Sequence, residues 1–249
     1  MHRKLIHPMM NNVRTFYEFP LLDKITARYT LEWNNQGAVQ RMKVHNRFTD
    51  FEGYFPSINS ILALPNIIKT YSQHKKSPIL GVPVPFLVVD AIRFLDSIVQ
   101  PGMQVLELGG GNSTLWFLKK GADVITVEHS AEWADYILKF IDSNAEISRK
   151  GHLQMEIKSG GNTISFIENQ PDKAFDIILI DCANEHTRRN ECVRAARNKV
   201  KKGGWMIIDN SDHPQNWLGV DLMKDFDRIR YTGYAPMCLV VCQTSFWKI

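Results

Sequence analysis

The residues best suited to hold a ligand lie in a glycine-rich segment, 107–114 (ELGGGNST), which continues a short apolar run. Glycines let the backbone pass close to a bound molecule without Cβ clashes, and a helix that begins after them points free N–H groups at that molecule. A second apolar run ends at Glu128, whose carboxylate can accept two hydrogen bonds from a ribose diol. The two features together are typical of a nucleoside-binding site.

The elements that must position these residues form a regular alternation from about residue 83 onward. Apolar or alternating runs predict strands at 104–108, 123–128, 152–158, 175–181 and 205–209, with a β-rich end at 237–247. Amphipathic patterns predict helices after Pro83-Val84-Pro85, at 113–120, after a capping Ser130, at 185–202 and at 217–229. Strands that alternate with helices form βαβ units, so the predicted fold is α/β, with a doubly wound, mostly parallel sheet.

Residues 1–82 have a different texture and are predicted to be an irregular and helical N-terminal extension of the domain at 83–249. Residues 58–71 are apolar enough for a helix, which Pro65 should break or kink. Phe48, Phe51, Tyr54 and Phe55 lie close together in the sequence. They suit a lid that excludes water from a reaction site, and they equally suit a packing or oligomer surface, with a homodimer as one option.

Composition excludes several classes of protein. In 249 residues, 44% are hydrophobic and 22% are charged, which excludes a disordered chain, a collagen-like repeat and a disulfide scaffold. No apolar run reaches the ~18 residues of a membrane helix, and the first residues lack the apolar stretch of a signal peptide. A net charge of +4 is too small by itself to indicate a nucleic-acid partner, and the four cysteines lack zinc-type spacing. A cytoplasmic protein with no membrane partner is the expectation.

Two cofactors use a glycine loop followed by an acidic strand end. A dinucleotide fingerprint places a third glycine where helix and strand pack closely, and here that position is Thr114. The strand also carries Glu107 just before the glycines, and a pyrophosphate is repelled by that charge. S-adenosylmethionine has no phosphate and carries an ammonium group, which suits an acidic rim. The residues therefore favour S-adenosylmethionine over NAD.

These segments resemble a known family. ELGGGNST followed by VITVEHS is similar to the first two motifs of the class I (Rossmann-like) S-adenosylmethionine-dependent methyltransferases. FDIILID and GGWMIIDNSD resemble that family's fourth- and fifth-strand motifs, in the right order, so the likeness covers about residues 85 to 249. It implies a seven-stranded sheet whose last strand, within 237–247, is antiparallel.

The resemblance also implies roles for single residues. Glu107, Gly109 and Gly111 would line the methionine end of the cofactor, Glu128 would hold the ribose, and Asp181 would sit at the rim of the catalytic pocket. The full set expected to bind the cofactor is Glu107, Gly109, Gly110, Gly111, Asn112, Ser113, Glu128, His129 and Asp181. Trp133 fits the core better than a wall against the adenine.

A metal site is a further option. Asp181 and Asp209-Asn210 follow neighbouring parallel strands, so their oxygens can converge on Mg²⁺ or Ca²⁺. This arrangement is similar to that of the catechol-type O-methyltransferases. The lysine that those enzymes carry just after the fourth strand is missing here, where the sequence reads Asp181-Cys-Ala-Asn-Glu-His186. Alternatively, Asp181 contacts the cofactor while Asp209 and Asn210 shape their loop.

The candidate bases are His186 and His213, supported by Asp209 and Asp212. Histidine is suited to the role because its unperturbed pKa of about 6.5 lets it accept a proton at neutral pH. Both histidines are expected in loops at the carboxyl ends of strands. The predicted catalytic set is therefore His186, Asp209 and His213.

The sequence as a whole predicts a methyltransferase acting on a hydroxyl of a small molecule, of sugar or phenol type. Arg188 and Arg189 lie nearest the expected pocket, either as part of a solvated basic helix face or as a grip on an anionic acceptor. Three alternatives stay open: a non-catalytic cofactor- or partner-binding module, an NAD-dependent oxidoreductase, and an RNA methyltransferase. Against the last alternative, this sequence lacks the Asn/Asp-Pro-Pro-aromatic motif of base-amino methyltransferases.

Overall fold

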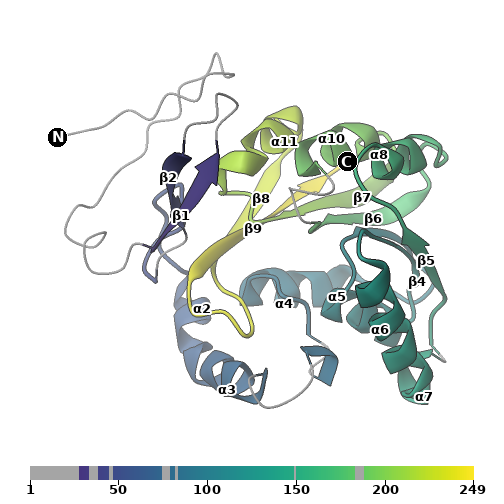
Figure 1. The fold of residues 1–249 in the computed structure, drawn as a ribbon, viewed down its shortest axis with the longest axis horizontal. Helices are drawn as coiled ribbons and strands as arrows, with labels where there is room; N and C mark the ends of the chain where they lie inside the picture. Colours follow the sequence, from purple (N-terminus) through teal and green to yellow (C-terminus); the bar gives the residue numbers. More distant parts are fainter. Residues whose placement is uncertain are drawn as a thin grey trace.

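The fold is a seven-stranded sheet covered by helices on both faces (Figure 1). The computed structural model describes residues 28–33, 39–44, 47–74, 79–81, 84–148, 150–182 and 188–249. The strands of the large sheet are β3 (Gln104–Leu108), β4 (Asp123–Glu128), β5 (Leu153–Ile157), β6 (Phe175–Ile180), β7 (Val200–Asp209), β8 (Arg228–Tyr234) and β9 (Val241–Lys248). A separate antiparallel pair consists of β1 (Arg28–Trp33) and β2 (Val39–Val44).

The strand order is β5-β4-β3-β6-β7-β9-β8. All pairs from β5 to β7 are parallel, whereas β9 runs antiparallel to both β7 and β8. The chain starts in the middle at β3, moves out to β5, and returns to β6 on the other side of β3. Ligands of doubly wound sheets bind at this reversal, outside the carboxyl ends of the strands. The predicted fold, with its antiparallel last strand, is confirmed.

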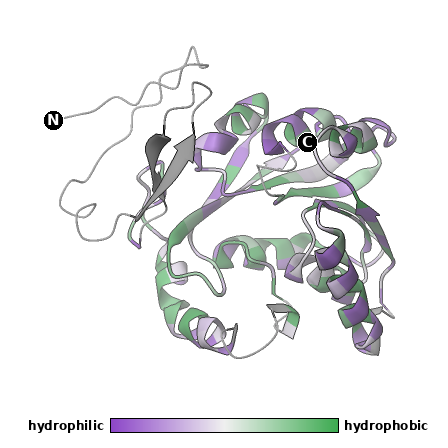
Figure 2. Ribbon diagram, in the orientation of Figure 1, coloured by the Kyte–Doolittle hydropathy of each residue, from purple (hydrophilic) through white to green (hydrophobic). Residues whose placement is uncertain are grey.

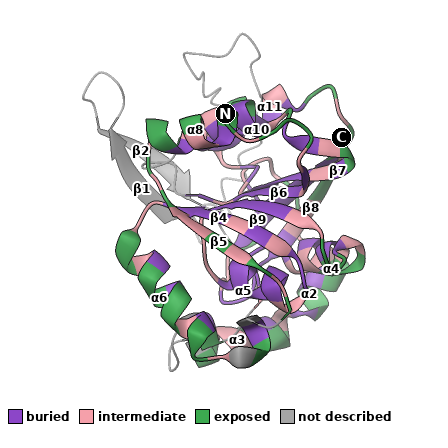
Figure 3. Ribbon diagram, turned by 90° about the vertical axis from the view of Figure 1, so that its right-hand side faces the viewer, coloured by how far each residue is buried: buried purple, intermediate pink, exposed green. Residues whose placement is uncertain are grey.

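Each face of the sheet has its own apolar core (Figure 2). The helices are α2 (Ile58–Leu62), α3 (Leu64–His74), α4 (Val89–Ile98), α5 (Asn112–Lys119), α6 (Ala131–Asp142), α7 (Ala145–Ser148), α8 (Gly161–Glu168), α10 (Arg189–Ala196) and α11 (Trp217–Leu222), with short 3-10 turns η1 (Ile79–Gly81) and η2 (Pro214–Asn216). Helices α4 to α6 cover one face, and α8, α10 and α11 cover the other (Figure 1). In Figure 3 the central strands are buried, while the outer side of α6 faces solvent.

Two helix boundaries follow from local sequence as expected. Ser57 caps α2, and the chain breaks at Ala63, so that Pro65 falls in the first turn of α3, where a missing N–H costs nothing. Ser130 caps α6 by accepting a hydrogen bond from the Trp133 N–H at 3.2 Å. The four cysteines form no disulfide. No helix among the described residues is long and apolar enough to cross a membrane.

Two predicted helices at the C-terminal side are wrong in extent. Within the predicted 185–202 helix, the structure describes residues 188–202. Of these, α10 ends at Ala196, and Val200 already begins β7. Lysines and arginines favour a helix, yet Val200 is buried beside Phe175, and a side chain at Gly204 would collide with the Asp176 carbonyl. The predicted 217–229 helix ends at Leu222, because the chain turns and Arg228 begins β8. Strand β8 was missed because Arg228, Arg230 and Gly233 interrupt the apolar pattern of this edge strand.

Candidate active site

A cavity of about 380 Å³ opens at the carboxyl ends of β3, β4 and β6. This is the edge of the sheet at which the strand order reverses. The cavity is lined by Phe86, Gly109, Gly110, Gly111, Asn112, Ser113, Glu128, His129, Ser130, Trp133 and Asp181. Eight of the nine residues predicted from the sequence to bind the cofactor are therefore brought together around one space.

Glu107 is the exception, and its expected place at the cavity is corrected by the structure. Its side chain is fully buried, and Oε2 accepts hydrogen bonds from the hydroxyls of Thr114 at 2.5 Å and Thr126 at 2.8 Å. Burial raises the pKa of the Glu107 carboxyl to about 7, although hydroxyl donors oppose that rise. Thr114 also accepts a hydrogen bond from the Gly111 N–H at 3.0 Å. Glu107 therefore stabilises the glycine loop indirectly: it binds Thr114, the residue in the third-glycine position, and Thr114 binds the Gly111 N–H.

Gly109 joins the ends of β3 and β6. Its φ of +96° lies in the left-handed region, and a Cβ there would stand 2.7 Å from the Asp181 carbonyl oxygen. Gly111 differs, because a Cβ at that position would meet nothing within 4 Å. The fold therefore requires a glycine at position 109, whereas Gly111 leaves open space beside the cavity.

Glu128 fastens the glycine loop to the turn after β4. Its Oε2 accepts a hydrogen bond from the Gly110 N–H at 3.0 Å, and its Oε1 accepts from the N–H groups of His129 and Ser130, each at 2.8 Å. The His129 Nδ1 also lies 2.8 Å from Oε1. Since Oε2 accepts one main-chain bond, it keeps a lone pair for a ligand hydroxyl.

Three lining residues were not predicted. Trp133 stands in the first turn of α6, where its indole N–H donates to the Gly110 carbonyl at 2.8 Å, so it is a wall of the cavity as well as a neighbour of the core. Ser130 was identified only as a helix cap. Phe86 comes from the segment before α4 and is 40% exposed. Of the three, only Trp133 is considered for the site from the sequence, where the core is favoured over a wall against the adenine; the structure places it at both.

The ends of β6 and β7 bring Asp181 and Asp209 side by side, as predicted. Asp209 is buried, and its Oδ1 accepts a hydrogen bond from the Thr244 hydroxyl at 2.6 Å. Burial, followed by the charge of Asp181, raises the pKa of the Asp209 carboxyl to about 8. Burial also raises the pKa of the Asp181 carboxyl, and the Arg189 guanidinium opposes that rise. Asp181 lines the cavity, whereas Asp209 and Asn210 do not.

Arg189 lies between the two strand ends. Its Nε donates to the Cys182 carbonyl at 2.8 Å, its Nη1 donates to the Asp209 carbonyl at 2.6 Å, and its Nη2 lies 3.4 Å from Asp181 Oδ1. The side chain is 8% exposed, so it is neither part of a solvated helix face nor free to grip an acceptor. The adjacent Arg188 is exposed and pairs with Glu191 at 3.2 Å. Within the described residues, no group of three or more His, Cys, Asp or Glu side chains is arranged to hold a metal ion.

The two predicted histidine bases have different outcomes. His186 lies outside the described residues. His213 caps η2, where its Nδ1 accepts a hydrogen bond from the Gln215 N–H at 3.4 Å. Its ring also contacts Phe51, with 5.0 Å between ring centroids. His213 does not line the cavity.

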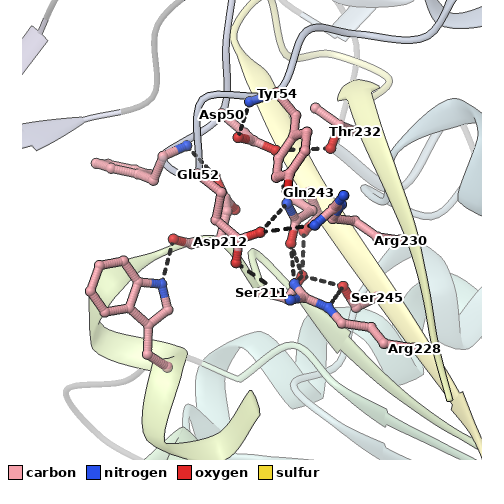
Figure 4. Close-up of polar contacts among 12 residues, drawn as sticks. Asp50, Glu52, Tyr54, Ser211, Asp212, Arg228, Arg230, Thr232, Gln243 and Ser245 are labelled. Atoms are coloured by element: carbon pink, nitrogen blue, oxygen red, sulfur yellow. Dashed lines mark hydrogen bonds and ion pairs between the residues drawn. The ribbon is translucent and has the colours of Figure 1, made fainter. Parts of the chain in front are cut away.

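Residues 47–57, here called the docking segment, bind the loop after β7 and the edge of the sheet at β8 (Figure 4). The Phe51 N–H donates to Asp212 Oδ2 at 2.9 Å, and Asp50 accepts from the Thr232 hydroxyl and the Gln243 amide, each at 2.8 Å. Burial, followed by the charge of Asp212, raises the pKa of the Asp50 carboxyl to about 6. These contacts join parts of the chain that are more than 150 positions apart in sequence.

Charged side chains complete the network in Figure 4. Glu52 lies between Arg228 at 3.4 Å and Arg230 at 3.3 Å, and Arg230 stacks over the Tyr54 ring at 3.5 Å. None of the aromatic residues of the proposed lid lines the described cavity. The docking segment instead covers the loop that carries Asp212 and His213.

Comparisons with known proteins agree with this fold. Residues 106–211 match a family described as "Methyltransferase domain". An O-methyltransferase from Bacillus cereus, solved in complex with SAH, is similar at 18% identity and a TM-score of 0.51, covering 78% of this chain and 92% of its own. A methyltransferase from Geobacter sulfurreducens is similar at 12% identity and a TM-score of 0.51, covering 78% and 98%. A precorrin 8w decarboxylase from Methanobacterium thermoautotrophicum has 14% identity and a TM-score of 0.50, covering 67% and 94%.

These structural likenesses concern the fold, because all three identities are low. A comparison with curated protein sequences gives no match.

Proposed function

We propose that this chain is a class I (Rossmann-like), S-adenosylmethionine-dependent methyltransferase that methylates a hydroxyl oxygen of a small molecule, of sugar or phenol type, as the matched methyltransferase domain and the fold support. One observation carries the choice of acceptor. Asp181 lines the cavity just after β6, its side chain is 27% exposed, and its neighbour at the end of β7 is the carboxylate of Asp209. Such polar groups suit hydroxyls.

The cofactor side of the site consists of Gly109–Ser113 and Glu128–Trp133. When bound, S-adenosylmethionine supplies an electrophilic methyl group. We propose that Glu128 Oε2 accepts a hydrogen bond from a ribose hydroxyl, that Trp133 and His129 flank the nucleoside, and that the open space at Gly111 admits the methionine part. Gly110, Asn112 and Ser113 complete that wall.

On the acceptor side Asp181 lines the cavity, while Arg189, Asp209 and Asn210 belong to the strand ends that support it and do not line the cavity. The docking segment contacts the loop after β7. Aligning the acceptor oxygen with the methyl group and the sulfur supplies most of the rate of such a displacement, so a base contributes less than placement does. We propose that Asp181 orients the acceptor hydroxyl. His186 stays the candidate base, while the hydrogen bond and ring contact of His213 favour a role in holding the β7 loop against Phe51.

A transfer assay tests the proposal. Protein incubated with methyl-labelled S-adenosylmethionine and a panel of phenols, sugars, amines and RNA should transfer label to an oxygen acceptor. Asp181→Asn should lower that transfer at least tenfold while changing S-adenosylhomocysteine affinity less than threefold, because the carboxylate faces the acceptor. Transfer only to RNA or amines would overturn the small-molecule proposal, and binding of NAD in place of the cofactor would favour the oxidoreductase. A cytoplasmic location stays a prediction, and the oligomeric state stays open, with a homodimer as one option.

A further inference from the structure

Arg189 fills the place between the ends of β6 and β7 at which the sequence suggests Mg²⁺ or Ca²⁺. A divalent ion there would need oxygens from Asp181 and Asp209. The nearer Asp181 oxygen already faces the Arg189 guanidinium at 3.4 Å, and the Asp209 carboxylate accepts from Thr244 at 2.6 Å. The residues as they stand therefore do not fit a metal ion, because their oxygens face other donors.

The position of the guanidinium is fixed by the fold. Arg189 begins α10, and the next residue, Asn190, ties that helix end to its neighbours. Its amide donates to the Gln215 carbonyl at 2.7 Å, and its Oδ1 accepts from the Gly219 N–H at 2.7 Å. The guanidinium then donates to the carbonyls of Cys182 and Asp209, which lie just beyond β6 and at the end of β7. Three of its N–H groups are thereby directed to oxygens of the two strand ends.

A guanidinium and a metal ion compete for such a place. Both are cations that satisfy carboxylate and carbonyl oxygens, and two cations within a few ångström in a buried site repel each other strongly. A guanidinium is charged at every physiological pH, whereas an ion must be taken up from solution.

We propose that the Arg189 guanidinium is the resident cation of the acceptor side, so that the wild-type protein holds Asp181 in place without a divalent metal. Arg189 is a positioning residue, because it is buried and acts through Asp181. The proposal rests on the proposed function in treating these strand ends as the acceptor side. The presence of the guanidinium at the two strand ends does not depend on that function.

Binding of Mn²⁺ alone, followed by electron paramagnetic resonance of the free ion, tests the proposal without any substrate. Wild type and Arg189→Lys should show no Mn²⁺ binding that depends on Asp181. Any weak binding that they do show should therefore be the same after Asp181→Asn is added. Arg189→Ala should gain one Mn²⁺ site with at least tenfold higher affinity than any wild-type binding, and the double variant Arg189→Ala/Asp181→Asn should lose it. Arg188→Ala is the matched control, because it removes the adjacent exposed arginine and should gain nothing.

Two results would overturn the proposal. One is a wild-type Mn²⁺ site that Asp181→Asn abolishes. The other is an Arg189→Ala protein that melts cooperatively yet gains no Mn²⁺. If Arg189→Ala does not fold, Arg189→Met, which keeps the length and apolar stem of the side chain, takes its place in the same titration. Titration with S-adenosylhomocysteine separates the two claims: absent binding defeats the proposed function, while the Mn²⁺ results still decide the role of Arg189.

Discussion

Contacts within residues 107–133 hold the proposed cofactor side of the site. The proposed acceptor side combines local contacts of Arg189 with contacts to the last strand and to the docking segment, which are distant in sequence. Glu128 binds three N–H groups in the glycine loop and the turn after β4. On the acceptor side, Asp209 depends on Thr244 in the last strand, and Asp212 binds the Phe51 N–H from 161 positions away. The contrast teaches that the walls of the cavity around the glycine loop form from local sequence, while the loop after β7, beside the proposed acceptor side, needs contacts from across the domain.

The largest expected effect is on the cofactor side. Glu128→Ala leaves three N–H groups without their acceptor, and each unsatisfied group costs about 1–3 kcal/mol where it stays buried. We expect S-adenosylhomocysteine affinity to fall at least 100-fold and the melting temperature to drop by at least about 6 °C. Calorimetric titration and thermal unfolding measure both. Glu128→Gln, which keeps one acceptor oxygen, should lose less in each, and equal affinity in Glu128→Ala would contradict the cofactor side as described.

On the acceptor side, Arg189→Ala should destabilise the protein with little effect on the cofactor. It leaves the Asp181 carboxylate and two carbonyls without their donor, and breaking a pair of this kind costs about 3 kcal/mol. Denaturant unfolding should show that loss, while S-adenosylhomocysteine affinity changes less than tenfold. Arg188→Ala, the exposed control, should change stability by less than about 0.5 kcal/mol. A large loss of cofactor affinity in Arg189→Ala would show that the two sides are not held independently.

The docking segment should make stability depend on pH. The pKa of Asp50 rises on folding from 3.8 to about 6, so the folded state binds this proton more tightly than the unfolded chain does. The Asp50 contribution is therefore most favourable below pH 3.8 and is lost as the pH rises to about 6, by roughly 2–3 kcal/mol. The free energy of unfolding of Asp50→Asn, relative to wild type, should change by that amount between pH 4 and pH 7. A difference that stays constant over this range would contradict the account of Asp50.

Much of the cofactor side was predictable because its determinants are local. The glycine run, the ends of β3 and β4 and the Ser130 cap lie within about 30 residues, and seven of the eight residues predicted in that stretch line one cavity. Glu107 was misplaced because its type fits a cofactor amine equally well, and only the hydroxyls of Thr114 and Thr126, the latter on β4, show that it faces inward.

The acceptor side was predictable only in part. The neighbouring ends of β6 and β7 follow from the order of the parallel strands, so Asp181 and Asp209 were placed correctly. The role of Arg189 could not be predicted, because its local sequence shows only one of several charges on a basic helix. Nothing there indicates that α10 begins at Arg189 or that its guanidinium donates to the carbonyls of Cys182 and Asp209. The partners of Asp212 and Gln243 in the docking segment depend on chain closure across the whole domain.

The smallest expected effect on cofactor affinity is that of a substitution at Glu107. Glu107→Gln should change S-adenosylhomocysteine affinity less than threefold, because Glu107 lies beneath the loop and not at the cavity. Since the pKa of Glu107 is about 7 in the folded state, the neutral amide resembles its protonated form. Calorimetric titration at pH 6 compares the variant with wild type, and a loss as large as that of Glu128→Ala would place Glu107 at the ligand after all.

A crystal structure of the complex with S-adenosylhomocysteine tests the division of the site most directly. The account predicts the ribose hydroxyls at Glu128, the adenine beside Trp133 and the sulfur facing Asp181, with Arg189 still bound to the carbonyls of Cys182 and Asp209. A ligand whose sulfur points away from Asp181, or whose ribose makes no contact with Glu128, would contradict it.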